Sequence, residues 1–333
     1  MGINIYQFLR KYKALPLFIL AAVMPLLLSN NYHLHVLNLA GIYAILTLSL
    51  NMLTGFTGLL CVGQIAFYGI GAYTSAIFSV TLGMPVFFSM LMGGVVASLF
   101  GLLVGLPTLR LRGLYLAVAT MAFGEIMYQL FVNLEPITNG TKGILNVPAP
   151  ALFGFKFNTY GSYYYLVLLT LAFLVTITHN IIRSRVGRAM LSIRENEVAA
   201  AASGINPTRY KVMVFMCSAF FAGIAGSLYV HEVRFVSPES FVTAESSSVL
   251  AMMVVGGIGS IPGAIVGGMA LTIIPELFRS FGDIRLVVYG ATIVMIIIFA
   301  PKGLGGLFEW AGDHINKRAA AAINQSPRRD RKL

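Results

Sequence analysis

Long apolar segments separated by short polar ones account for most of the chain. A helix that crosses a bilayer needs about 20 mostly apolar residues. The segments that fit or approach this length are Leu15–Leu28 (short), Leu34–Leu53, Leu59–Leu82, Met84–Leu106, Leu114–Leu134, Tyr163–Ile182, Val212–Val230, Ile261–Phe278 and Ile284–Ala300. Val249–Ile258 is too short to cross straight, so we expect a re-entrant piece or a tilted, extended helix. The pattern predicts an all-α, polytopic transmembrane helical bundle of about ten segments.

The polar stretches between these segments are too short to form a soluble domain. Glu135–Gly161, rich in Gly, Pro, Asn and Thr, is expected outside the membrane, and the basic stretch Arg183–Lys211 inside. We therefore predict one transmembrane domain over residues 1–312, with a long inner loop at 183–211, followed by a basic cytoplasmic tail at 313–333. The basic and apolar N-terminus lacks a small-residue cleavage site, so we expect an uncleaved signal-anchor.

Composition and charge agree with a lipid environment. The chain has 57% hydrophobic and 11% charged residues, whereas roughly 25% of residues are charged in soluble domains. The net charge of +11 raises the question of nucleic acid, but 18 of the 23 basic residues lie in four clusters, namely Arg10–Lys13, Arg110–Arg112, Arg183–Lys211 and Lys302–Lys332. Positive loops stay in the cytoplasm. We expect an even number of crossings, ten or alternatively eight, with both termini cytoplasmic, membrane lipid as the surroundings and no nucleic-acid partner.

Glycine is concentrated in two apolar stretches, one in each half of the chain. The first, Thr54–Tyr73, contains Gly58 and Gly63, and the second, Val255–Gly268, contains Gly256, Gly257 and Gly259. Glycine lets helices pack closely, and it also permits broken helices, whose backbone must line a cavity or be buried in protein. Close packing alone is one interpretation. The density favours broken helices beside a pathway, as in transporters with internal repeats.

Few polar side chains lie inside the predicted spans. Glu125 is the clearest ionisable residue, and Asn51 and Gln64 are its polar companions in other segments. A carboxylate within a membrane is costly, which makes Glu125 a candidate for the pathway. The alternative is a structural tie between helices. The spans carry no ladder of Asp, Glu and His that a proton pump requires, and the histidines lie near span ends, where we expect wet interface residues.

The sequence does not indicate an enzyme. It contains no Gly-x-x-x-x-Gly-Lys-Ser/Thr phosphate loop and no His-Glu-x-x-His arrangement. We therefore expect no ATP hydrolysis by that route, no catalytic residues, no bound metal and no cofactor.

The inner loop contains a strong helix-forming segment. Glu195–Ser203 has four successive alanines, including Ala200 and Ala201, and acids in its first turn, Glu195 and Glu197. Gly204 is expected to end the helix, and Pro207 follows shortly. A short helix exposed between two spans favours docking by another protein, although a solvated connector is the alternative.

Gly187–Asn206 (GRAMLSIRENEVAAAASGIN) resembles the coupling loop of LivM-type permeases of branched-chain amino acid ABC importers. Further similar stretches occur in the expected order, Gly58–Phe67, Leu109–Ile126, Thr138–Ile144 and Val255–Ala264. The resemblance implies a permease of the bacterial inner membrane that pairs with a LivH-type permease, two cytoplasmic ATPase subunits and an extracytoplasmic solute-binding protein. It also implies that Glu195, Glu197, Ala200, Ala201 and Gly204 contact the ATPase.

One departure and several alternatives accompany this resemblance. The importer pattern Glu-Ala-Ala-x-x-x-Gly is matched by Glu197–Gly204 with one extra residue. Related permeases serve urea or short-chain amides, and the pathway, with few fixed charges, suits any small neutral or zwitterionic solute. A secondary transporter or channel without an ATPase, or a membrane scaffold, would be different classes of protein. The first would need ligands for a coupling ion, and the second would not need glycine-broken segments.

Overall fold

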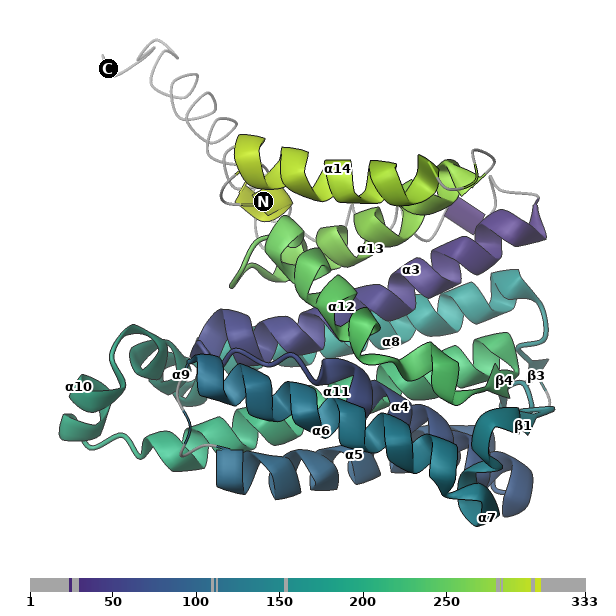
Figure 1. The fold of residues 1–333 in the computed structure, drawn as a ribbon, viewed down its shortest axis with the longest axis horizontal. Coiled ribbons are helices and arrows are strands. Elements are labelled where there is room, and N and C mark those ends of the chain that lie inside the picture. The colour runs from purple at the N-terminus through teal and green to yellow at the C-terminus, as the bar shows by residue number, and fades with distance from the viewer. Residues whose placement is uncertain are drawn as a thin grey trace, which may run out of the picture.

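The computed structural model describes residues 24–25, 30–108, 111, 113–152, 155–279, 282, 284–300 and 303–306 (Figure 1). Its long elements are helices α3 (Asn31–Leu50), α4 (Gln64–Ala76), α5 (Val86–Thr108), α6 (Leu114–Asn133), α8 (Tyr160–Arg183), α11 (Pro207–Val233), α12 (Thr243–Gly256), α13 (Ile261–Leu277) and α14 (Ile284–Phe299). The short elements are α7 (Glu135–Thr138), α9 (Arg185–Glu195), α10 (Glu197–Ala202), the π-helices η1 (Asn51–Gly55) and η2 (Ile77–Thr81), the 3₁₀ helices η3 (Gly140–Lys142) and η4 (Pro238–Phe241), and strands β1 (Ile144–Leu145), β2 (Ala151–Leu152), β3 (Phe155–Lys156) and β4 (Phe235–Val236).

The expected all-α membrane bundle is confirmed. Within the described residues, five helices are long and apolar enough to cross a membrane, namely Asn31–Gly55, Val86–Pro107, Leu114–Asn133, Tyr160–Arg183 and Pro207–Val233. The shorter apolar helices are Thr243–Gly256, Ile261–Leu277 and Val287–Phe299. Most of the expected first span, Leu15–Leu28, lies outside the described residues, as do Arg10–Lys13, Arg110, Arg112, Lys302 and the tail at 313–333.

Local sequence explains where several helices begin. Asn206 accepts a hydrogen bond from the Arg209 amide and precedes a proline at the first helical position of α11. Thr159 caps α8 through the Ser162 amide, and Ser260 caps α13 through the Gly263 amide. Short polar side chains satisfy amides that have no partner at a helix start, and proline there lacks the amide altogether.

Small residues hold α4, α5 and α11 together at the centre. A side chain on Gly71 would collide with the carbonyl of Gly223, and one on Gly93 would lie 2.7 Å from the carbonyl oxygen of Gly71. Ser227 of α11 donates to the carbonyls of both Gly71 (3.1 Å) and Gly223 (2.9 Å). In a bilayer, this close backbone approach and its hydrogen bonds replace the hydrophobic driving force between helices.

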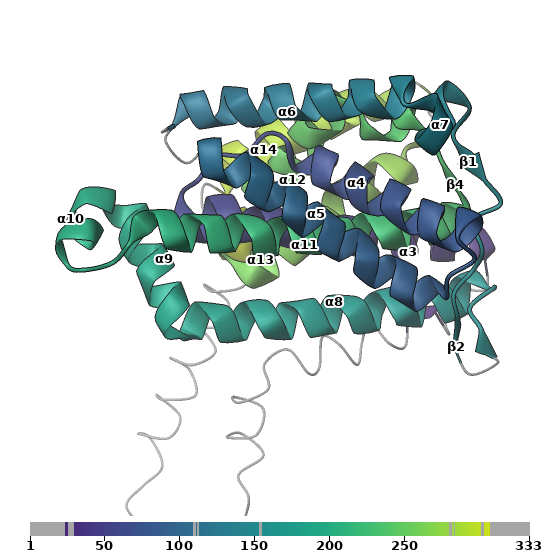
Figure 2. The ribbon, with the colours of Figure 1, turned by 90° about the horizontal axis from the view of Figure 1, so that it is seen from below.

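The two ends of the bundle are different. Helices α9 and α10 project from one end, which we call the α10 end, and the small strands cover the opposite end, the β end (Figures 1 and 2). There β1 pairs with β4 in antiparallel register, Ile144 opposite Val236, and β2 pairs with β3. The segment expected to link two spans outside the membrane therefore folds onto the end of α11.

Helices α4 and α12, of 13 and 14 residues, have opposite directions. Both begin near the middle of the bundle, where the amide of Ile65 donates to Oγ of Ser246 over 3.2 Å (Figures 1 and 2). From there, α4 runs toward the β end and α12 toward the α10 end. A long helix precedes each of them in the chain: α3 with η1 precedes α4, and α11 precedes α12. An irregular segment separates the long helix from the short one in both cases. The breaks expected in the two glycine stretches are present, before α4 and between α12 and α13, whereas the irregular segment before α12, residues 234–242, contains no glycine and was not expected. Helices α4 and α12 form an inverted pair.

Candidate functional site

The start of α4 lies directly against α6. The amide of Val62 donates to Oγ1 of Thr120 over 3.0 Å, and a side chain on Gly63 would collide with the carbonyl of Thr120. Gly63 therefore provides the close approach that places the α4 N-terminus beside α6. Because the amides of a first helical turn have no partners within the helix, this N-terminus contributes partial positive charge at the middle of the bundle.

Glu125 lies beside the start of α12. Its Oε2 accepts a hydrogen bond from Oγ1 of Thr243 over 3.0 Å, and its Oε1 accepts one from Gln129 over 3.3 Å. Asn133, four residues further on, donates to the Gln129 carbonyl over 2.8 Å. These three polar side chains form a stripe along the exposed face of α6, which we call the α6 polar stripe. Glu125 is therefore both hydrogen-bonded to α12 and exposed at the surface of this chain.

Gln64 has a different environment from Glu125. It is buried, at 1% exposure, and its Nε2 donates to Ser49 over 2.7 Å and to Ser218 over 3.0 Å. Ser218 donates in turn to the Ser49 carbonyl over 2.7 Å. The side chain therefore links α3, α4 and α11 inside the subunit, a structural role that the sequence had suggested only for Glu125.

The other pathway candidates meet near the α10 end. Asn51 of η1 donates from Nδ2 to the Ser260 carbonyl over 3.0 Å and accepts from the Gly259 amide at Oδ1 over 2.8 Å. It therefore links the end of the first long helix to the loop between α12 and α13, which contains Gly257 and Gly259. Both glycines have positive φ, 115° and 82°. We call this group, together with Gly55 and Gly58, the glycine junction.

Gly256 packs against α13 at the same end. A side chain on Gly256 would collide with the Gly263 carbonyl, and one on Gly267 would lie 2.6 Å from the Cα atom of Gly256. The glycines of the second stretch therefore serve both roles considered for them. Gly256 allows close helix packing, and Gly257 and Gly259 allow the chain to turn.

The helix expected at Glu195–Ser203 begins later than predicted. Glu195 is the last residue of α9, and Asn196 breaks the helix because its extended backbone and side chain cap α10 at the amides of Val198 and Ala199. The interpretation of Glu195 as a first-turn acid is therefore wrong, and only Glu197 has that position. Sequence reasoning missed α9 as a separate element. Its signal is the amphipathic spacing of its buried residues, Gly187, Ala189, Met190 and Ile193.

Helix α10 is attached to α11 on one side and exposed on the other. Nζ of Lys211 lies 2.6 Å from Oε1 of Glu197, with the two side chains 5% and 27% exposed. Ala200 is buried, whereas Ala201 is exposed. Gly204 has a φ of 82°, and no atom lies within 4 Å of where its Cβ atom would be. The expected helix end at Gly204 is confirmed, and its backbone conformation is one that favours glycine.

The β end contains polar side chains that sequence reasoning did not select. Glu232 accepts from Asn38 over 2.8 Å and faces Nδ1 of His35 at 3.2 Å. His231 is 1% exposed, with its ring nitrogens 2.9 Å from Ser75 and 2.7 Å from the Pro148 carbonyl. The expectation of a wet interface is wrong for His231, because the strand-bearing segment covers the end of α11. An ionisable pair directly after an apolar span was the available signal.

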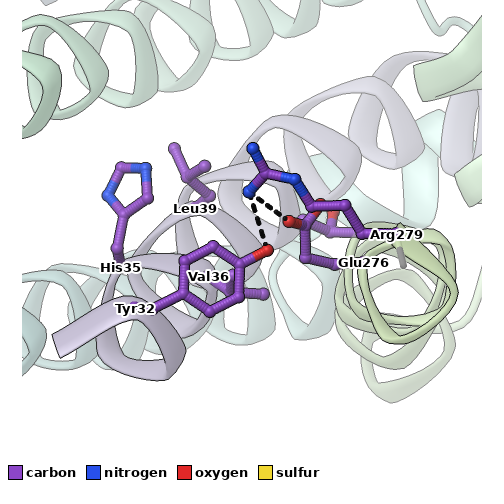
Figure 3. Close-up of a pocket in the computed structure, with 7 residues that line it drawn as sticks. Tyr32, His35, Val36, Leu39, Glu276 and Arg279 are labelled. Atoms are coloured by element: carbon purple, nitrogen blue, oxygen red, sulfur yellow. Dashed lines mark hydrogen bonds and ion pairs between the residues drawn. The ribbon is translucent and has the colours of Figure 1, made fainter. Parts of the chain in front are cut away.

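A pocket of about 290 Å³ opens at the same end between α3 and α13 (Figure 3). Arg279 points across it and donates to the Tyr32 hydroxyl over 3.0 Å and to Glu276 over 3.1 Å. The charge of Arg279 is thus balanced by Glu276.

In the part of the chain that the structure describes, no three or more His, Cys, Asp and Glu residues are grouped so that they could hold a metal ion.

Comparisons with known proteins agree with this architecture. Residues 32–299 match the family described as the permease component of a branched-chain amino acid transport system. The chain is 37% identical over 89% of its length to the high-affinity branched-chain amino acid transport permease LivM of Salmonella typhimurium strain LT2, and covers 75% of that protein. For LivM of Escherichia coli strain K12, the identity is 38%, over 86% of this chain and 73% of the relative.

A weaker similarity extends to the second type of permease. The chain is 26% identical to LivH of Escherichia coli strain K12 over 80% of its length and 92% of the relative. No solved structure shows a significant match. The family match covers all the described spanning helices from α3 to α14. The chain therefore belongs to the family of permease components of branched-chain amino acid transport systems.

Proposed function

We propose that the chain is the LivM-type permease subunit of an ATP-binding-cassette importer for branched-chain amino acids. The observation that carries this proposal is its similarity to LivM along most of the chain, together with the weaker similarity to LivH. The partners would be a LivH-type permease, two cytoplasmic ATPase subunits and an extracytoplasmic solute-binding protein. The relatives are named for branched-chain amino acids, and these are the proposed solute in place of urea or short-chain amides.

The proposed location is the bacterial inner membrane, with the α10 end in the cytoplasm. Arg183, Arg185, Arg188, Arg194 and Arg209 all lie at this end, and basic residues favour the cytoplasmic side. Residues 1–312 would form the permease domain. The termini, which lie outside the described residues, are proposed to be cytoplasmic as well.

The ATPase would dock on the exposed side of α10. Val198 is 67% exposed, and Ala201 and Gly204 are exposed beside it. Small side chains allow a partner's surface to approach the helix closely. Glu197 and Ala200 would act from beneath this surface, because one binds Lys211 and the other is buried. This arrangement supports α10 as the coupling helix.

The solute path would run along the α6 polar stripe. Glu125, Gln129 and Asn133 are exposed on a membrane-spanning helix, and lipid cannot satisfy such groups. The stripe therefore faces another protein or a water-filled path, and the second permease is the proposed neighbour. Because the N-termini of α4 and α12 lie beside Glu125, positive and negative partial charges occur together there. That combination suits a zwitterion.

Substitution of Glu125 tests the path. Glu125→Gln should leave uptake within about threefold of the parent, because Gln can still accept from Thr243, while Glu125→Leu should impair uptake or pairing, at roughly 0.6–2 kcal/mol per lost membrane hydrogen bond. Assembly is measured by co-purification of the second permease, and transport by uptake in proteoliposomes. Parental uptake and pairing in both variants would contradict the proposed path.

Reconstitution tests the function as a whole. Proteoliposomes containing both permeases, the ATPases and the binding protein should accumulate labelled leucine in an ATP-dependent manner, and urea should not compete. This chain alone should neither hydrolyse ATP nor accumulate leucine. ATP turnover by the purified chain, or accumulation of urea in preference to leucine, would contradict the proposal.

A further inference from the structure

The Arg194 side chain reaches from α9 into the glycine junction. Its Nη1 donates to the Gly55 carbonyl over 2.5 Å. A Cβ atom on Gly259 would lie 2.9 Å from the same nitrogen, and one on Gly58 would lie 3.3 Å from the Arg194 Cγ. The guanidinium therefore lies where segments from both halves of the chain meet, although the residue as a whole is exposed.

The charge of Arg194 complements this position. Gly55 ends the continuous helix Asn31–Gly55, and α12 ends one turn before Gly259, at Gly256. Helix C-termini have carbonyl groups without partners and partial negative charge, so a cation is favourable beside them. The C-terminal ends of two helices, both with partial negative charge, thus meet around one arginine. The two hydrogen bonds of Asn51 connect the end of the first helix to the loop that follows α12.

The contact leaves little freedom for independent movement. A side chain on Gly55 would collide with Asn51 and would lie 2.7 Å from the Gly259 amide nitrogen. Tightly packed groups of this kind transmit a displacement instead of absorbing it. We therefore expect movement of Arg194 relative to the bundle to shift the C-terminal ends of both the helix Asn31–Gly55 and α12.

Arg194 is also close in sequence to the coupling helix. It lies in the last turn of α9, two residues before Asn196, the cap of α10. Helix α10 has a second attachment to the bundle, the ion pair between Glu197 and Lys211 of α11. A displacement of α10 can therefore reach the bundle by two routes, one through Lys211 and one through Arg194.

We propose that Arg194 is a positioning residue that transmits movement of the coupling helix to the glycine junction, and so to the inverted pair α4 and α12. This inference rests on the proposed function, because it assumes that a partner ATPase displaces α10. It assigns to Arg194 a role in coupling, separate from docking of the ATPase and from contact with solute.

The test uses the complete transporter in proteoliposomes. Arg194→Ala should assemble with the ATPase and retain its basal ATP hydrolysis, while uptake per ATP hydrolysed should fall about tenfold or more, the factor that corresponds to loss of one charge-assisted hydrogen bond. Arg194→Lys, which keeps the charge, should recover part of the loss. Arg188→Ala is the matched control, because Arg188 is an exposed arginine on the same helix that donates to the Arg183 carbonyl over 3.5 Å. It should behave as the parent.

A cross-link tests the contact itself. Cβ atoms at positions 58 and 194 would be 3.7 Å apart, which suits a disulfide. In a background without Cys61 and Cys217, Gly58→Cys combined with Arg194→Cys should cross-link on oxidation, and the covalent link should restore part of the coupling that Arg194→Cys loses. Gly58→Cys alone controls for the positive φ of 74° at this position.

Three results would overturn the proposal. They are parental uptake per ATP in Arg194→Ala, loss of ATPase binding in that variant, and failure of the cross-link to form or to restore coupling. The proposed function fails in a different way, because then the parent complex itself would show no ATP-dependent leucine uptake, while the cross-link would still report on the contact.

Discussion

Glu197→Ala should release α10 from the bundle without unfolding the spans. The substitution removes the carboxylate 2.6 Å from Nζ of Lys211 and leaves a cation whose side chain is 5% exposed. Breaking a fully buried pair on one side costs about 3–5 kcal/mol, and an exposed pair is worth about 0–1 kcal/mol. Because the Glu197 side chain is 27% exposed, we expect an intermediate cost of about 2 kcal/mol. This reduces the ratio of docked to undocked α10 roughly thirtyfold.

The partner substitution should cost less. Lys211→Met removes the buried cation and leaves a carboxylate that water can reach, so we expect about 1 kcal/mol. In the double variant Glu197→Ala with Lys211→Met, neither charge remains, and the total cost should be well below the sum of the single variants. That deviation from additivity is the coupling energy of the pair.

Amide hydrogen exchange measures the release directly, because the α10 amides exchange from the undocked state. Exchange of α10 should accelerate in Glu197→Ala, while exchange in α5 and α11 should stay parental. Glu195→Ala, which removes an exposed carboxylate from the end of α9, is the control and should leave α10 protected. Equal exchange in Glu197→Ala and the control, or additive costs in the double variant, would refute the reasoning.

Three further predictions concern other parts of the molecule. Gly204→Val should lower ATPase stimulation through backbone strain of about 1 kcal/mol or more, because φ there is 82°. Ala201→Trp should lower ATPase stimulation as well, because it adds bulk to the exposed face of α10. Membrane insertion of both variants, checked by membrane fractionation, should be parental. Ser192→Cys should react with an impermeant maleimide in inside-out vesicles and stay unlabelled in intact cells, since α9 is proposed to be cytoplasmic. Gly71→Val should prevent stable folding, seen as loss of a monodisperse peak in detergent, because its side chain would collide with the Gly223 carbonyl.

The spans could be predicted from the sequence because lipid imposes a simple requirement on length and polarity. The predicted Met84–Leu106 and observed Val86–Thr108 differ by two residues at each end. The glycine-broken segments were predicted as well, because the concentration of glycine at 54–73 and 255–268 favours breaks, with close packing alone as the alternative. A sequence pattern reports whether a segment can cross the membrane, and five of the expected segments correspond to described helices that are long and apolar enough to do so.

The roles of individual residues were harder to predict from the sequence. Gln64 and Glu125 are both polar residues in apolar segments, yet one is buried between three helices and the other exposed, and only packing separates them. Arg194 was one basic residue among six in its loop. Its position depends on the approach of segments 139 residues apart, which no local pattern encodes. The early start predicted for α10 failed because Asn196 can both continue a helix and cap one.

The length of α12 has a consequence for biogenesis. Its 14 residues are fewer than the roughly 20 needed to cross the hydrocarbon core, and the irregular segment before it has backbone groups that lipid cannot satisfy. The translocon therefore cannot release α12 into the bilayer as an independent span. It must stay in a protein-lined environment until α13 has been synthesised and can pack its Gly263 and Gly267 against Gly256. We therefore expect α12 to reach its final position only after α13 has been synthesised.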